Sequence, residues 1–319
     1  MRDPVMPVRR LCGLAALLVL ASVLFMTLGA RGNWGFVLPF RATKLLALIV
    51  VAVAISTATI LFQTITQNRI LTPSIMGFDA LYVLILTTAV YVLGGQAVAR
   101  LSDQLVFVVN VVCLVLASLA LFGTLLRQVR ADLLRMILTG IVFGVLFRSL
   151  TGFMQRIIDP NEFAVIQVSS YARFNRVDTE LLALSAGVTG LALMVVWRMR
   201  HRLDVLALGH DAAINLGEHP RRGQIEVLIL IAILVSVSTA LVGPVAFLGL
   251  LVVSLAHLVT PSARHAVLIP SAGLISALVL VGGQTTLERA LALSTPLSVV
   301  VDLIGGIVFL LLLLKGSSR

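Results

Sequence analysis

The stretch VLILIAILVSVSTALVGPVAFLGLLVVSLAHLVTPSA, residues 227–263, contains no Asp, Glu, Lys or Arg. A helix needs about 20 mostly apolar residues to cross the hydrocarbon core of a bilayer, so these 37 residues are too many for one span. Gly243-Pro244 lies near the middle, and proline both removes a helical hydrogen bond and disfavours helix at the preceding residue. The stretch therefore predicts two membrane spans, near 226–242 and 245–260.

The rest of the chain shows the same pattern of long apolar runs between charged residues. Eight further spans are expected near 11–30, 45–63, 75–94, 105–123, 133–151, 181–197, 266–283 and 296–314. The total is about ten transmembrane helices in one domain that covers residues 1–319. The expected fold class is thus an all-α, polytopic integral membrane protein.

Composition supports a membrane location and argues against nucleic-acid binding. The chain is 59% hydrophobic and 12% charged, with a mean hydropathy of +1.09. A soluble domain carries about 25% charged residues, so most of this surface must face an apolar medium. The net charge of +10 comes from 22 Arg and 2 Lys against 14 acidic residues, but the arginines lie between apolar runs rather than on one stripe. Such basic loops are typical of membrane proteins, and nucleic acid is not an expected partner.

The basic loops also predict the orientation. With ten spans and both termini in the cytoplasm, 15 of the 24 Lys and Arg residues fall on the cytoplasmic side, as the positive-inside rule favours. A signal peptide is an alternative interpretation of the N-terminus, because Arg9-Arg10 precede an apolar stretch that ends at Leu28-Gly29-Ala30. That stretch is long for a signal peptide, and its removal would leave nine spans.

The most informative polar segment is GHDAAINLG, Gly209 to Gly217, within a cytoplasmic loop at about 203–218. Asp211 is expected to cap the start of a short helix, and Gly217 to end it. A short helix flanked by arginines suits docking into a groove on a soluble partner. A surface helix that lies on lipid headgroups is the alternative, and the pattern alone does not separate the two.

The sequence lacks the common motifs of catalysis and metal binding. A phosphate-binding P-loop needs Lys followed by Ser or Thr, whereas Lys44 precedes Leu45 and Lys315 precedes Gly316. HExxH and GxSxG do not occur, and the five histidines show no ligand spacing. Cys12 and Cys113 fall inside apolar runs. Neither an enzymatic activity nor a directly bound metal or cofactor is therefore expected.

Two charged residues inside predicted spans are candidate functional residues, because a charge in lipid is costly. Arg148 lies towards the end of the fifth span, and Asp302 lies in the tenth. The alternatives are that Arg148 extends to the membrane interface and that Asp302 makes an interhelical hydrogen bond.

Four stretches resemble a known family, the permease subunits of binding-protein-dependent ABC importers for iron(III)-siderophores, which also import cobalamin and haem. The first is Arg41-Ala42-Thr43-Lys44, and the second is Gln67 to Gly77, with its Thr72-Pro73 pair. The third is Gly209 to Gly217, which resembles the family's cytoplasmic coupling loop. The fourth and most specific is Gly243 to Leu250, GPVAFLGL. Within the family, Pro73 to Val83 resembles the branch that handles catecholate siderophores.

The resemblance implies a type II ABC importer permease fold in a bacterial cytoplasmic (inner) membrane. It implies a second permease chain, identical or paralogous, two ATP-binding cassette subunits that hold the ATP, and a periplasmic or lipid-anchored substrate-binding protein. The residues implied in ATPase coupling are Gly209, His210, Asp211, Ala212, Ala213, Ile214, Asn215, Leu216 and Gly217.

The resemblance also implies roles for charged residues on the other side of the membrane. Arg41, Lys44 and Arg289 would be cations that meet acidic residues on the binding protein, and Arg148 would line the substrate path. Asp302 stands where a small or neutral residue is expected in the family. An ion-driven secondary transporter, or the same fold importing cobalamin or haem, is the alternative function, and the siderophore itself stays open.

Overall fold

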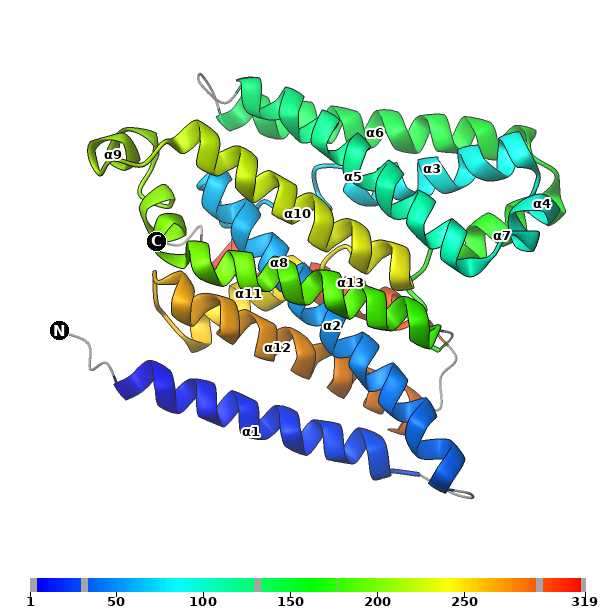
Figure 1. Ribbon diagram of the computed structural model, residues 1–319, viewed down its shortest axis with the longest axis horizontal. Coiled ribbons are helices and arrows are strands. Elements are labelled where there is room, and N and C mark those ends of the chain that lie inside the picture. Colours follow the sequence, from blue (N-terminus) through cyan, green and yellow to red (C-terminus); the bar gives the residue numbers. More distant parts are fainter. Residues whose placement is uncertain (1–4, 30–33, 129–132, 176, 291–294, 317–319) are drawn as a thin grey trace.

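The computed structural model describes residues 5–29, 34–128, 133–175, 177–290 and 295–316, and within them all regular structure is helical (Figure 1). The helices are α1 (Val5–Thr27), α2 (Trp34–Thr66), α3 (Phe78–Leu93), α4 (Gly95–Arg100), α5 (Asp103–Gln128), α6 (Leu133–Ile157), α7 (Pro160–Ser169), α8 (Thr179–Leu206), α9 (His210–Asn215), α10 (Pro220–Val242), α11 (Leu248–Val259), α12 (His265–Thr285), the π-helix η1 (Thr286–Ala290) and α13 (Leu297–Gly316).

The apolar helices lie where the sequence predicts spans. Among the described residues, seven helices are long and apolar enough to cross a membrane. Three shorter apolar helices, α3, α11 and the Leu297–Val308 part of α13, lie at the other three predicted spans. The prediction of an all-α polytopic membrane protein is thereby confirmed.

Several predicted helix ends are wrong. α2 begins at Trp34 instead of near residue 45, α6 continues to Ile157, and α8 continues to Leu206. The segment expected as a long loop after residue 151 also contains α7. Charge-free gaps mark the apolar part of a helix, whereas charged residues with partners extend the same helix into the interface.

The core is built around α2, which packs against α8, α10, α11 and α12 (Figure 1). Within the most apolar window of each helix, 72% of the α2 residues are buried but only 11% of the α1 residues. The apolar side chains that α1, α5 and α6 leave exposed, such as Leu17, Val112 and Val142, suit contact with lipid or a second chain.

Two helices are too short to cross the bilayer alone. α3 has 16 residues and α11 has 12, which correspond to about 24 Å and about 18 Å against a hydrocarbon core of about 30 Å. Irregular backbone, residues 68–77 and 243–247, precedes them. Irregular backbone at membrane depth is tolerated where protein surrounds it, and Gly77 is buried against Gly144 of α6. A Cβ at Gly77, which has a φ of 94°, would lie 2.9 Å from the Cα of Gly144.

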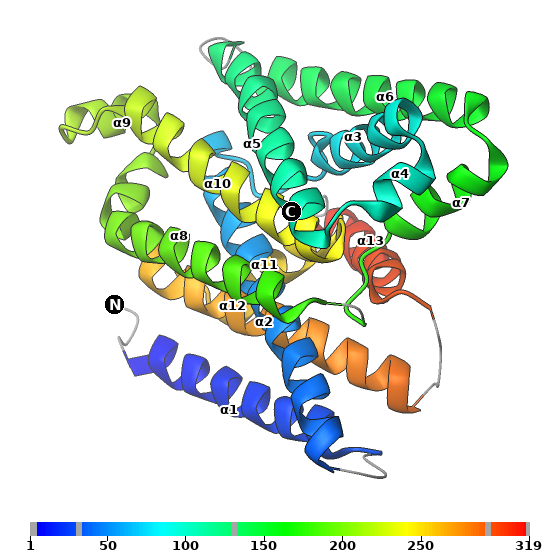
Figure 2. The same cartoon turned by 45° about the vertical axis from the view of Figure 1, so that its right-hand side comes forward.

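The bundle has two distinct ends (Figures 1 and 2). α9 lies at one of them, called here the α9 end, and α4 and α7 lie at the opposite one, the α7 end. The half-length helices α3 and α11 lie between these two ends.

Candidate translocation cavity and coupling site

A cavity of about 550 Å³ lies between α3, α6, α13 and the segment before α11. Its wall includes the last turns of α6 and the residues directly after α7, so it lies towards the α7 end. Its acidic and basic side chains are Arg148, Asp302 and Asp79, and Tyr171 also lines it. The structure therefore brings together the two residues that the sequence singled out inside the membrane and adds a third.

Asp302 makes the interhelical hydrogen bond that was the alternative reading of its sequence position. Its Oδ1 accepts a hydrogen bond of 3.0 Å from the backbone N–H of Phe247, the residue directly before α11. The first N–H groups of a helix have no partner within the helix, and the start of a helix carries partial positive charge. The carboxylate of α13 thus satisfies the start of a half-length helix inside the membrane.

Arg148 is exposed on α6 and lines the cavity. Its guanidinium nitrogens lie next to Gly144, where a Cβ would approach them to 3.6 Å. No hydrogen bond or ion pair is recorded for Arg148 in the part of the chain that the structure describes. Its role in the substrate path stays a prediction.

Asp79 is the cavity residue that sequence reasoning missed. Its Oδ1 accepts a hydrogen bond of 3.3 Å from the Ser74 hydroxyl, and its Oδ2 is covered and has no hydrogen-bond partner. In the sequence, Asp79 is a carboxylate a few residues inside the predicted span 75–94, but there it marks only the edge of an uncharged gap.

At the α9 end, the predicted short helix is present as α9. Gly217, with a φ of 81°, ends it through two backbone hydrogen bonds of 2.9 Å, from Gly217 N–H to the Ile214 carbonyl and from Glu218 N–H to the Ala213 carbonyl. The expectation that Asp211 caps the start is wrong. Gly209 is the N-cap residue and Asp211 lies inside the first turn, because the helix begins at His210, two residues before the start that a cap at Asp211 would give.

The surface of this loop is apolar. Leu208, Ile214 and Leu216 are 62%, 51% and 62% exposed, whereas Ala213 is fully buried. Exposed aliphatic side chains on a short, well-ended helix favour contact with another protein. Ala213 instead holds the helix to the body of the molecule.

An arginine on α8 links the loop to two helices. Arg202 donates hydrogen bonds of 3.1 and 2.8 Å to Glu218 Oε1 and one of 2.8 Å to Glu226 Oε2 on α10. These hydrogen bonds hold the pKa of Glu218 below its ordinary value. We call Arg202, Glu218 and Glu226 the α9 bracket.

A second polar link lies under the same loop. Asp204 Oδ1 accepts from the backbone N–H of His265 at 2.8 Å and lies 2.7 Å from its Nδ1. The other ring nitrogen of His265 lies 2.8 Å from the Thr64 hydroxyl. The base of the loop is thus tied through α8 to α12 and α2.

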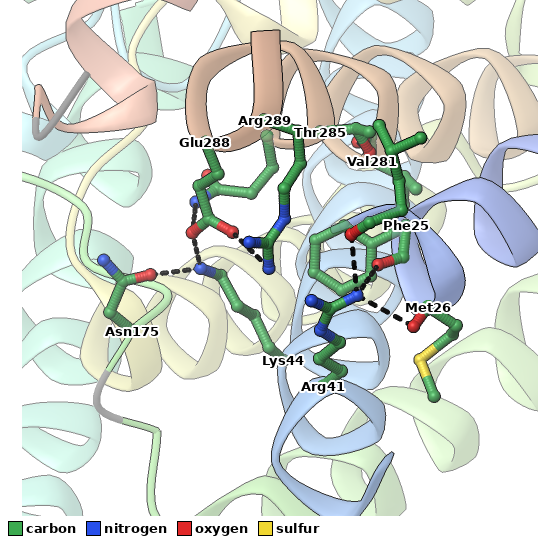
Figure 3. Close-up of polar contacts among 11 residues, drawn as sticks. Phe25, Met26, Arg41, Lys44, Asn175, Val281, Thr285, Glu288 and Arg289 are labelled. Carbon is green, nitrogen blue, oxygen red and sulfur yellow. Dashed lines mark hydrogen bonds and ion pairs between the residues drawn. The ribbon is translucent and has the colours of Figure 1, made fainter. Parts of the chain in front are cut away.

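Arg41, Lys44 and Arg289 are the cations expected to contact the binding protein, and they lie where α2 passes the end of α12 (Figure 3). Arg41 donates to the carbonyls of Phe25, Met26 and Leu28 at 3.2, 2.8 and 3.0 Å, and it is only 6% exposed. It satisfies the end of α1, whose last carbonyls have no helical partner.

Lys44 is also buried, and its ammonium donates to Glu288 and Asn175 (Figure 3). Glu288 also accepts from Gln284 at 2.6 Å. Arg41 and Lys44 are buried and each already has a partner within the chain, so their role in docking the binding protein stays a prediction. The Arg289 side chain is 29% exposed, and one of its nitrogens lies 3.9 Å from Glu288.

No group of three or more metal-ligating side chains occurs within the residues that the structure describes.

Half-length helices whose starts lie beside a charged cavity are an architecture of membrane transporters. The protein is, by fold, a polytopic transport permease. A model of the FecCD transport family matches residues 12–315, and the chain belongs to this family.

Individual relatives agree with the family. The chain is 45% identical over 284 residues to the petrobactin import system permease protein YclO of Bacillus subtilis (strain 168), an alignment that covers 89% of this chain and 90% of the relative. It is 33% identical over 275 residues to the petrobactin import system permease protein FatC of Bacillus anthracis, covering 86% and 78%. The fold matches a solved metal-chelate type ABC transporter in an inward-facing conformation, with a TM-score of 0.81, 23% identity and coverage of 97% and 99%.

Proposed function

We propose that the protein is the membrane permease of an ABC importer that brings ferric siderophores of the petrobactin type into the cytoplasm. The observation that carries this proposal is the 45% identity to YclO over nearly the whole length of both chains. The substrate is the iron chelate, and the energy comes from ATP on a separate subunit. This agrees with a chain that has no P-loop.

The coupling segment Gly209–Gly217 is the proposed contact with the ATP-binding cassette subunit. Its support is the apolar surface formed by Leu208, Ile214 and Leu216. This assignment places the α9 end and both termini in the cytoplasm, and the α7 end outside. The complete importer would contain two permease chains, two ATPase subunits and an external binding protein in the bacterial inner membrane.

Arg289 is the proposed direct contact for the binding protein, since its side chain is 29% exposed whereas Arg41 and Lys44 are buried. Arg41 and Lys44 would act through their partners, because they fix α1, η1 and the Asn175 segment around Arg289. This division of roles follows from burial.

The function is tested by uptake of ⁵⁵Fe-petrobactin into cells that express the permease together with its ATPase and binding protein. Uptake should require the permease and an ATPase with an intact P-loop. Ferric citrate, haem and cobalamin serve as competing cargoes. Uptake of haem or cobalamin in place of the ferric siderophore would contradict the proposal.

The coupling assignment has its own matched pair of variants. Ile214→Glu places a charge on the exposed face and should abolish ATP-driven uptake while leaving the permease in the membrane. Ala213→Leu overfills a buried position and should lower the folded amount of protein instead. Normal uptake with Ile214→Glu would remove this face from the ATPase contact.

A further inference from the structure

The cations near the end of α12 share one carboxylate. Glu288 of η1 forms ion pairs with Lys44 and with Arg289, and Arg41 lies beside them (Figure 3). Within the part of the chain that the structure describes, no other acidic side chain is recorded in an ion pair with these three cations. Positive charge is therefore in excess at this site, and Glu288 balances part of it.

The two oxygens of Glu288 are engaged to different degrees. Oε1 accepts hydrogen bonds from the Lys44 ammonium and, at 2.6 Å, from the Gln284 amide. Oε2 lies 3.9 Å from a guanidinium nitrogen of Arg289, a contact that counts as an ion pair but is too long for a hydrogen bond. The carboxylate is thus fixed through Lys44 and Gln284 and contacts Arg289 only loosely.

The loose contact leaves the Arg289 guanidinium available to another protein. The Arg289 side chain is 29% exposed, whereas that of Lys44 is 6% exposed. Its aliphatic part lies just after the end of α1, where a Cβ at Gly29 would be 3.5 Å from Arg289 Cδ. A guanidinium has five N–H donors in one plane, so it can bind a carboxylate of a partner through two parallel hydrogen bonds. Glu288 Oε2 would lie next to that second carboxylate and repel it.

The backbone at this point is irregular. η1 is a π-helical turn of five residues directly after α12, and it carries both Glu288 and Arg289. Single π-helical turns are rare and frequently lie at functional sites. The same irregular turn therefore places the half-exposed cation and the carboxylate that balances it next to each other.

We propose that Glu288 is an internal competitor for the docking cations, whose carboxylate weakens the binding of an acidic residue of the binding protein at Arg289. The inference rests on the proposed function as an ABC importer and adds a residue that sets the strength of docking. A binding protein has to leave after it delivers its cargo. A carboxylate within the permease itself limits the attraction that Arg289 and Lys44 exert on an acidic partner, and so keeps docking reversible.

The test measures how tightly the importer's purified binding protein docks to the permease–ATPase complex in lipid nanodiscs, by biolayer interferometry at about 0.05 M and about 0.5 M salt. Glu288→Gln removes the charge but keeps a side-chain oxygen that accepts from Lys44 and Gln284. It should tighten docking about three- to tenfold at low salt, and the gain should shrink at high salt because the charges are screened.

Asp103→Asn is the matched control for net charge. Asp103 is an exposed carboxylate at the start of α5, apart from the end of α12 (Figures 1 and 2). Its replacement makes the same change in charge as Glu288→Gln and should leave docking unchanged.

A double-mutant cycle separates competition from support of the fold. Arg289→Gln should weaken docking, and Glu288→Gln should tighten docking less in this background, because the cation that the two carboxylates share is gone. If Glu288→Gln alone leaves too little folded protein, the double variant Lys44→Met/Glu288→Gln removes both members of the pair together. It should still dock more tightly than Lys44→Met.

Unchanged or weaker docking of a folded Glu288→Gln complex would overturn the proposal and make Glu288 a support for Lys44. An equal gain in Asp103→Asn would also overturn it, since net charge alone would then explain the effect. Failure of the proposed function looks different, because the wild-type importer then takes up no ⁵⁵Fe-petrobactin, whatever the strength of docking.

Discussion

Arg202 offers a direct test of whether the α9 bracket fixes the coupling loop. Arg202→Gln removes the hydrogen bonds of 2.8 and 3.1 Å to Glu218 and the one of 2.8 Å to Glu226. Hydrogen bonds to charged groups contribute about 1.5–3 kcal/mol when buried, and exposed ion pairs about 0–1 kcal/mol. The Arg202 side chain is 39% exposed and that of Glu218 is 17% exposed, so we expect a loss of about 1–2 kcal/mol in the positioning of the loop.

A loss of this size should lower ATP-driven uptake about five- to thirtyfold if the loop must be in place for coupling. ATP hydrolysis by the assembled complex should continue, so that the number of ATP molecules used per chelate rises. Arg202→Lys should give an intermediate result, because one ammonium cannot reproduce the forked contact with both carboxylates. Uptake and ATP hydrolysis are measured in proteoliposomes at equal permease content.

Arg200→Gln is the matched control on the same helix. Arg200 lies over the Trp197 ring, 5.1 Å from its centroid, and donates to the Trp197 carbonyl, without a recorded contact to the loop. Its replacement should leave coupling unchanged. Normal coupling in Arg202→Gln, or an equal defect in both variants, would refute a positioning role for the bracket.

Three further predictions concern pH, packing and the ion pair near η1. The pKa of Glu218 is lowered in the folded protein, so its contribution to stability is present above its unfolded-state pKa of about 4.3 and is lost as pH falls through the folded-state pKa. The melting temperatures of the purified wild type and of Glu218→Gln should therefore differ at pH 7 and converge below about pH 4. A difference in melting temperature that persists below this pH would contradict the prediction. Gly77→Ala should destabilise the protein by about 1–3 kcal/mol because Gly77 has a positive φ and contacts Gly144. Gly187→Ala should not destabilise it, since there is open space around a Cβ at Gly187. Equal melting temperatures for Gly77→Ala and the wild type would disprove the close contact. Lys44→Met should cost about 2 kcal/mol by removing the nearer of the two cations beside Glu288, and the double variant Lys44→Met/Glu288→Gln should recover part of this loss in a thermal unfolding cycle. Additive effects of the two substitutions would show that the pair is not coupled.

The number of spans was predictable because it depends on local composition. A run of about 20 apolar residues has one low-energy place in a bilayer, whatever the rest of the chain does. The division of residues 227–263 at Gly243-Pro244 was predictable for the same reason, since proline acts on its own backbone. Gly217 ends α9 as expected, because a helix end needs only a few neighbouring residues.

The charged residues were less predictable because their partners are distant in sequence. Lys44 and Glu288 are 244 positions apart, and nothing near Lys44 in the sequence indicates that its ammonium is already engaged. The same distance effect hid the ends of α2 and α8, where cations with partners continue the helix beyond its apolar part. A charge count along the chain cannot separate a surface cation from a buried one that is paired.

Asp302 shows how a departure from the family pattern can have a local cause. α11 starts inside the membrane, so its first N–H groups cannot be satisfied by water and need an acceptor from protein. The Asp302 carboxylate supplies that acceptor from α13 and also balances the partial positive charge at the helix start. Asp79 lies at the start of the other half-length helix, α3, but no described cation pairs with it there. The two carboxylates therefore differ in their surroundings: Asp302 accepts the backbone N–H at a helix start, whereas one oxygen of Asp79 has no hydrogen-bond partner.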